Sequence, residues 1–136
     1  MLKFLVPTAA LFTTLMAYAQ GAWVILDVRS FDYGDRVRVV LDLDRNLAVT
    51  QMLEYQALTL NFDGELRRIQ CPEGVPPGIA LGYSSEGVKL SWSGAQWVRS
   101  FQLTSPPRQV IDLYRRVGDE QVPFTPPPKV QGLPCH

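Results

Sequence analysis

The apolar residues of this 136-residue chain recur with a period of two, and this period constrains the fold more than any other feature. The segment RVRVVLDLD at residues 36–44 places Val39, Leu41 and Leu43 on one face of an extended strand. Clusters of Gly, Pro, Asp and Ser separate it from similar short runs. These runs cover residues 22–30, 57–62, 79–84, 88–93, 96–104 and 108–116. The pattern predicts one all-β domain, either a small β-sandwich of two sheets or a partly closed barrel.

Local signals predict how some of the strands connect. The Asp-Gly pair at residues 63–64 predicts a turn after a strand that ends at Phe62, followed by a returning strand. Residues 85–87, Ser-Glu-Gly, predict a second hairpin. Residues 46–58 alternate less clearly, and we expect a helical turn or two in this segment.

The two ends of the chain differ from its middle. Residues 1–19 combine Lys3 with an apolar run and end in AYA before Gln20, which predicts a secretory signal peptide. The alternative is an uncleaved membrane anchor, because the apolar run could barely span a bilayer. Residues 20–116 form the predicted domain. Residues 117–136 contain five prolines and predict an extended tail that lies on the domain or leaves it.

Charge excludes two classes of partner. Without Lys3, the chain keeps 12 Lys and Arg residues (13 minus 1) against 13 Asp and Glu residues, a net charge of −1. A nucleic-acid-binding domain normally carries a basic surface, and a peripheral membrane binder a polybasic segment. We therefore expect neither nucleic-acid binding nor polybasic membrane binding. No second apolar run is long enough to cross a bilayer, so we also expect no membrane insertion after signal cleavage.

The two cysteines also bear on the compartment. Cys71 and Cys135 are an even number in a chain that we expect to be exported to the periplasm or cell envelope, which favours a disulfide. Such a bond would fix the tail to the domain and contribute roughly 4 kcal/mol in the loop-entropy description. The alternative is two independent thiols.

One phrase of the sequence occurs twice, as RVVLDLDR at residues 38–45 and as RQVIDLYR at residues 108–115. In each copy an Asp follows the first Arg by four residues, so both side chains lie on one strand face about 13 Å apart. If the two strands pair antiparallel and in register, Arg38 opposes Asp112 and Asp42 opposes Arg108. Such pairs would give a charge-paired outer surface, each contributing about 0.2–1 kcal/mol.

The same residues also suit a binding surface. Arginine binds carboxylates through paired hydrogen bonds, and aromatic rings such as those of Trp97 and Tyr114 can stack on sugars. Trp23 and Trp92 are better explained as core residues. Residue types alone leave the pairing and the binding interpretations open.

The segment GDRVRVVLDLDRNLAVT, followed by GVKLSW and VRSFQLTSPPRQVIDLYR, resembles the AMIN domain over about residues 23–116. This module precedes the catalytic domain of many bacterial N-acetylmuramoyl-L-alanine amidases and occurs in pilus secretins. The resemblance implies a sandwich of two small sheets that binds peptidoglycan or an envelope partner, with Arg38, Asp42, Arg108 and Asp112 as the positions carried over. Gln109 departs from the usual aliphatic residue, and we expect that side of its strand to be partly exposed.

Catalytic chemistry lacks its usual residues. The one histidine, His136, ends the chain, so neither a His-containing metal cluster nor a His base for a Ser or Cys nucleophile is expected inside the domain. We predict a non-catalytic module without cofactor or metal that binds peptidoglycan. The alternative is a protein-interaction subunit of an envelope assembly, such as a pilus secretin or a cell-division complex.

Overall fold

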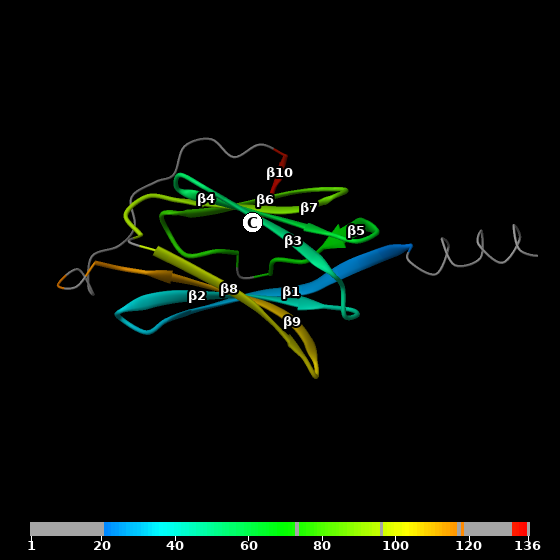
Figure 1. The fold of residues 1–136 in the computed structure, drawn as a ribbon, viewed down its shortest axis with the longest axis horizontal. Coiled ribbons are helices and arrows are strands. Elements are labelled where there is room, and N and C mark those ends of the chain that lie inside the picture. The colour runs from blue at the N-terminus through cyan, green and yellow to red at the C-terminus, as the bar shows by residue number, and fades with distance from the viewer. Residues whose placement is uncertain (1–20, 73, 96, 117, 119–131, 136) are drawn as a thin grey trace, which may run out of the picture.

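The protein is an all-β sandwich of two sheets, as the sequence predicts. In the computed structural model, residues 21–72, 74–95, 97–116, 118 and 132–135 are described, and within them ten strands form two five-stranded sheets. The sheets lie one above the other as two layers (Figure 1). The predicted signal peptide and most of the predicted tail fall outside the described residues.

The first sheet has the strand order β5-β1-β2-β9-β8. All its neighbouring strands run antiparallel except β5, which pairs parallel to β1. The strands span Glu65–Ile69 (β5), Ala22–Asp32 (β1), Arg36–Leu43 (β2), Pro107–Tyr114 (β9) and Trp97–Thr104 (β8). The two echoed phrases therefore form the central, directly paired strands β2 and β9.

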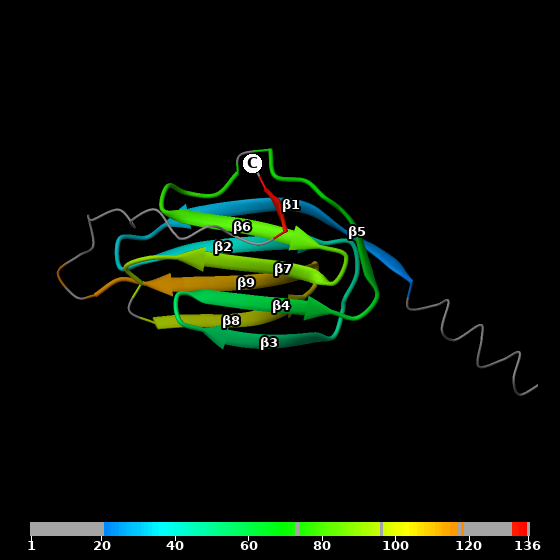
Figure 2. The same ribbon diagram turned by 90° about the horizontal axis from the view of Figure 1, so that it is seen from above.

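The second sheet has the strand order β10-β6-β7-β4-β3, and all its pairs are antiparallel. Its strands span Leu133–Pro134 (β10), Ile79–Ser84 (β6), Gly87–Trp92 (β7), Ala57–Phe62 (β4) and Val49–Glu54 (β3). The predicted hairpin at residues 85–87 is confirmed, because β6 and β7 pair with Ser84 opposite Gly87. Figure 2 shows β3 and β8 together at one side of the sandwich and β1 and β6 at the other.

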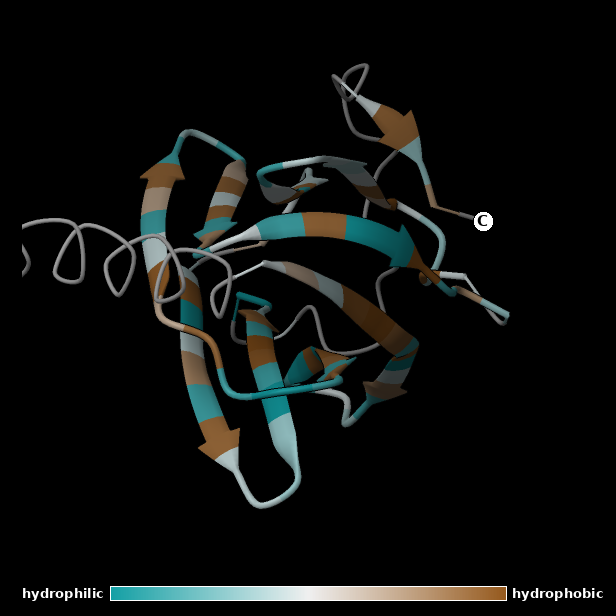
Figure 3. Ribbon diagram, turned by 90° about the vertical axis from the view of Figure 1, so that its right-hand side faces the viewer, coloured by the Kyte–Doolittle hydropathy of each residue, from teal (hydrophilic) through white to brown (hydrophobic). Residues whose placement is uncertain are grey.

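The core lies between the sheets and follows the period of two. Figure 3 shows hydrophilic and hydrophobic bands alternating along the strands. Trp23 is fully buried, its ring packs edge-on against Phe62 at 4.8 Å between centroids, and Trp92 is 3% exposed, so both predicted core tryptophans are confirmed. Alternation buries one set of side chains from each central strand and leaves the other set on the outer faces.

Two local predictions are wrong. The chain does turn at residues 63–64, but β5 does not return along β4; it crosses to the first sheet and lies parallel to β1. β4 has no free side, since β3 and β7 already flank it. Residues 46–58 contain β3 instead of a helical turn, because six residues of β3 pair with β4 and tertiary pairing overrides weak local preference.

Gln109 is also not where the sequence suggested. It is fully buried and shares its face of β9 with the core residues Ile111 and Leu113. Its Nε2 donates a hydrogen bond of 2.7 Å to Ser100 Oγ, whereas its Oε1 accepts none from the described residues. This position faces the core, where an aliphatic side chain would be usual. The polar amide of Gln109 therefore lies inside the sandwich.

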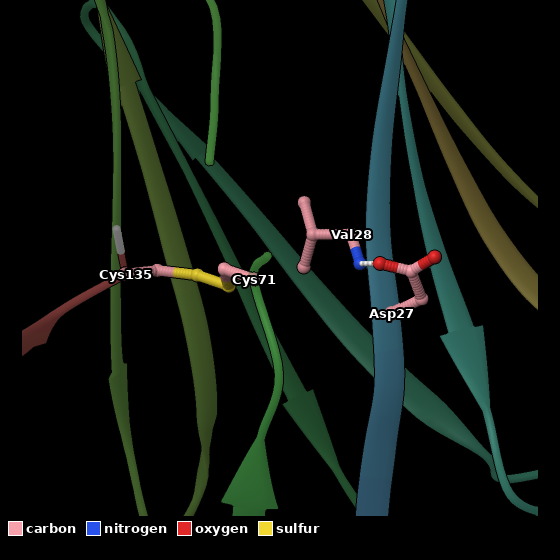
Figure 4. The surroundings of a disulfide bond; sticks show 4 residues. All are labelled: Asp27, Val28, Cys71 and Cys135. Carbon is pink, nitrogen blue, oxygen red and sulfur yellow. Dashed lines mark hydrogen bonds between the residues drawn. A yellow bond between two sulfur atoms is a disulfide. The ribbon is translucent and has the colours of Figure 1, made fainter. Parts of the chain in front are cut away.

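A disulfide joins the end of the described chain to the loop after β5. Cys71 and Cys135 are bonded, as predicted, with their Cα atoms 6.0 Å apart, and both residues belong to the core. Figure 4 shows the bond beside β1, with the Val28 side chain directed toward Cys71. The backbone N–H of Cys135 also donates to the Leu81 carbonyl at 2.8 Å. The bond therefore fixes β10 against β6 and against the first sheet.

Candidate functional site: the outer face of the first sheet

The side of the first sheet that faces away from the core is called here the outer face. Strand register places its residues in four rows across β1, β2, β9 and β8, the first of which begins at Tyr33, one residue beyond β1. The rows are Tyr33, Arg36, Tyr114 and Trp97; Phe31, Arg38, Asp112 and Arg99; Arg29, Val40, Val110 and Phe101; and Asp27, Asp42, Arg108 and Leu103. All six predicted ligand-binding residues lie on this one face.

Arg38 and Asp112 hold each other. They are opposite in the register, as predicted, and the guanidinium donates through Nε and Nη2 to the two carboxylate oxygens at 2.8 and 3.0 Å. Arg99 Nη2 adds a third contact at 3.3 Å, and Asp112 is fully buried beneath these side chains. Burial by itself raises the pKa of Asp112, but hydrogen bonding to Arg38 and Arg99 and the nearby positive charges bring it below its ordinary value.

Asp42 has a different partner from the one that the register suggests. It lies opposite Arg108, as predicted, yet its carboxylate accepts two hydrogen bonds from Arg29 on β1, at 2.7 and 2.9 Å. This paired contact raises the pKa of Arg29. The Nε of Arg108 instead donates to the Pro106 carbonyl at 3.2 Å. The predicted Asp42–Arg108 ion pair is therefore wrong, although the two residues are neighbours across the strands.

The two predicted aromatic residues form a stack. The rings of Trp97 and Tyr114 are nearly parallel, with centroids 3.8 Å apart, and Trp97 remains 51% exposed. Because Tyr114 covers one face of the indole, the second face is the one open to solvent. A rigid aromatic plane with an open face is a common platform for sugar rings and apolar side chains.

Sequence reasoning missed several residues of the outer face. The guanidinium groups of Arg36 and Arg38 lie over the Tyr33 ring at 4.7 and 5.7 Å, and that of Arg99 lies over the Phe101 ring at 4.8 Å. The signal for part of this set was present, because Trp97, Arg99 and Phe101 alternate in β8 as the echoed residues do in β2 and β9. Arg29 had no such signal, since its role depends on which strand lies beside β2.

The arrangement supports binding better than acid–base catalysis. Asp42 and Asp112 are each held by an arginine through both carboxylate oxygens, so neither is placed as a free general base. Arg99 and Arg108, by contrast, each make one side-chain hydrogen bond within the described residues. Each guanidinium has five N–H donors, and those left over can bind a carboxylate.

A cavity opens at one end of the sandwich, beside the start of β8. It has a volume of about 540 Å³, and three of the exposed large apolar side chains of the molecule line it. Its lining includes Leu53, Tyr55, Trp92, Trp97, Val98 and Arg116. Gln56, which also lines it, adopts the left-handed backbone conformation with a φ of 59°. This conformation is uncommon for a residue other than glycine.

Comparison with known proteins identifies no relative. No family model matches the chain, and no curated protein and no solved structure matches it at a significant level. Within the described part of the chain, no helix is long and apolar enough to cross a membrane. In the same residues, no group of three or more His, Cys, Asp or Glu side chains could hold a metal ion.

Proposed function

We propose that this protein is a non-catalytic module of the cell envelope that binds peptidoglycan through the outer face of its first sheet. One observation carries the proposal: Arg99 and Arg108 keep uncommitted guanidinium donors on the same face as the half-exposed ring of Trp97. Peptidoglycan offers both complementary groups, namely carboxylates on its stem peptides and sugar rings that stack on aromatic planes.

The charges of the outer face favour an anionic ligand. The four rows contain five arginines against three aspartates, and two of those aspartates are neutralised by Arg29 and Arg38. The ion pairs also order the surface, since they hold long side chains in fixed positions. A preordered surface loses less conformational entropy on binding.

Two further features support the proposed location and family. The Cys71–Cys135 disulfide is compatible with an oxidising compartment outside the cytoplasm. The central strands β2 and β9 carry the phrases that resemble the AMIN domain, so an AMIN-like role is the function that the sequence favours. By this proposal the module localises whatever it is attached to or assembles with.

Co-sedimentation with purified sacculi tests the proposal. We expect the wild type to be enriched over an unrelated exported β-protein, and the double variant Arg99→Gln/Arg108→Gln to lose at least tenfold in affinity. The matched control is Arg67→Gln/Arg68→Gln, which removes the same charge from exposed positions on β5 at the far edge of the sheet. Denaturation curves should establish that all variants are folded.

The outcomes separate specific binding from general attraction. Equal losses in the two double variants would mean that net charge alone drives sedimentation, and the proposed site would be wrong. No enrichment of the wild type would reject peptidoglycan as the ligand. Trp97→Ala should also weaken binding, because it removes the open aromatic plane while leaving every charge in place.

A further inference from the structure

The side of the sandwich formed by β3 and β8 is called here the open side (Figure 2). Both strands end their sheets, and no described residue continues either sheet beyond them. A terminal strand leaves half of its backbone N–H and C=O groups without a partner strand. The question is what these edges can bind.

Backbone pairing identifies the groups that face outward on β8. Arg115 N donates to Asp35 O at 2.9 Å, which makes this a hydrogen-bonded antiparallel pair. Hydrogen-bonded pairs alternate along such a ladder, so the odd-numbered residues of β9 bond β2 and the even-numbered ones bond β8. In the register of β8 this leaves Val98, Ser100 and Gln102 with N–H and C=O groups directed away from β9.

The edge of β8 lacks the usual protection against strand pairing. Its eight residues contain no proline and no lysine, and the register with β9 runs from Trp97 to Thr104 without a bulge. Natural proteins generally block exposed edges with one of these devices, because a regular free edge pairs with other chains. An edge left regular over eight residues is suited to accept a strand.

The surroundings of the edge define the chemistry of that strand. Arg99 is the only charged residue of β8, and Arg108 lies on the adjacent strand, whereas the neighbouring Asp112 is buried and already bonded to Arg38. The inward-facing residues Ser100 and Gln102 are polar. The cavity at the start of β8 adds the exposed apolar surface of Leu53, Tyr55 and Trp97.

We propose that β8 binds an extended acidic segment of a partner protein by strand addition to the first sheet. Alternate acidic side chains of that segment lie on the outer face beside Arg99, with Arg108 one strand further away, and the intervening small polar side chains lie beside Ser100 and Gln102. A large apolar side chain at one end occupies the cavity beside Trp97. Main-chain hydrogen bonds provide affinity in this mode, and the alternating side chains provide specificity. The edge of β3 is less suited, because its only charged residue is Glu54.

A synthetic peptide that alternates Glu and Thr over the length of β8, with a Leu at each end, tests the proposal. We expect it to bind the full chain in fluorescence anisotropy and to protect the amides of Val98, Ser100 and Gln102 from hydrogen exchange. A peptide with Lys in place of Glu should bind at least tenfold more weakly. Replacing the terminal Leu residues by Ala should also weaken binding.

A matched pair of variants locates the site. Gln102→Pro removes one outward N–H from β8 without removing a bond to β9, whereas Gln102→Ala removes only the side-chain hydrogen bond to the Leu47 carbonyl. We expect Gln102→Pro, but not Gln102→Ala, to weaken peptide binding at least tenfold. Gln51→Pro makes the same change on β3. Asp63 N donates to Ala48 O, and the register of β3 with β4 therefore directs Gln51 N–H outward as well. This control should retain peptide binding, and both variants should retain binding to sacculi.

Several results would overturn the proposal. These are absence of peptide binding, undiminished binding by Gln102→Pro, or a loss confined to Gln51→Pro. A wild-type dimer that Gln102→Pro dissociates would show that a second copy of the chain occupies the edge instead. Failure of the sacculus assay would leave the peptide result unaffected, since the two experiments use different ligands and different variants.

Discussion

The two long sides of the sandwich differ in the contacts that join the two sheets. On the side of β5, β6 and β10, the disulfide between Cys71 and Cys135 joins the layers, and this is called here the disulfide side. Gly132 permits the close approach of β10 to β6, because a Cβ there would lie 2.7 Å from the Tyr83 carbonyl oxygen. On the open side, a hydrogen bond takes the place of the covalent bond. Gln102 Nε2 on β8 donates to the carbonyl of Leu47, in the segment that leads from β2 of the first sheet to β3 of the second.

This difference separates stability from recognition. The disulfide side is held by a covalent bond and by the pairing of β10 with β6, whereas the open side keeps the regular eight-residue edge of β8 and exposed apolar side chains. Regions that bind partners are commonly drawn from the less stable part of a fold. We therefore expect substitutions on the disulfide side to change unfolding most, and substitutions on the open side to change binding most.

The largest effect is expected from Cys71→Ala/Cys135→Ala. The disulfide closes a segment with a sequence separation of 64, and its loss should lower the free energy of unfolding by about 4 kcal/mol. Urea denaturation measures the change. Reductant should destabilise the wild type to a similar extent and leave the variant unaffected. A loss below about 1 kcal/mol would mean that the disulfide side does not depend on its bond.

The second prediction concerns the ion pairs between the two sides. Asp112→Asn should lower the free energy of unfolding by about 2–3 kcal/mol, because Arg38 would lose its paired carboxylate at a buried position. Arg38 is partly exposed, so water offsets some of the full value for a buried pair. The matched control Asp35→Asn, at an exposed turn carboxylate, should change stability by less than about 0.5 kcal/mol.

The same residue predicts a pH dependence. The pKa of Asp112 is lower in the folded protein than in the unfolded chain, so its contribution is present above the unfolded value of about 3.9. That contribution is lost as the pH falls through the folded pKa. Stability measured between neutral pH and the acid range should therefore decline less steeply in Asp112→Asn than in the wild type. Parallel curves would contradict this assignment.

The third prediction tests whether a buried polar group next to the open side lowers the stability of the fold. Gln109→Leu removes a buried amide whose Oε1 accepts no hydrogen bond from the described residues, and it should raise the free energy of unfolding by about 1 kcal/mol. Gln102→Leu is the contrast, because Gln102 lies opposite on β8 but is exposed and bonded to the Leu47 carbonyl, so this change should not raise the free energy of unfolding. If Gln109→Leu destabilises the protein instead, the amide is bonded and the open side is better satisfied than the structure indicates.

The smallest effect is expected for the charges of the outer face. A double-mutant cycle with Arg29→Ala and Asp42→Ala should give a coupling energy of about 0.5–1 kcal/mol, since both side chains are partly exposed. The cycle with Arg108→Ala and Asp42→Ala should give a coupling near zero. A larger coupling in the second cycle would restore the ion pair that the strand register suggested and remove Arg108 from the proposed site.

Sequence alone predicted the faces of the strands better than the contacts of individual side chains. The register of β2 with β9, including Arg38 opposite Asp112, followed from two similar phrases that pair antiparallel. The partner of Asp42 did not follow, because Arg29 belongs to a strand whose place beside β2 has no signal in either phrase. Long flexible side chains reach several neighbours, and the choice among them depends on the whole surface.

The sequence by itself determined the all-β class and the alternation of buried and exposed residues, and it favoured the cysteine pair that closes one side. These features follow from the amino-acid sequence itself, because the period of two reflects strand geometry and the cysteines can be counted directly. Only the tertiary structure decided that β5 crosses to the first sheet, that Gln109 faces the core, and that β8 is the last strand of its sheet among the described residues. Each of these depends on which strands lie side by side, and strand neighbours far apart in the sequence are chosen by packing rather than by local pattern.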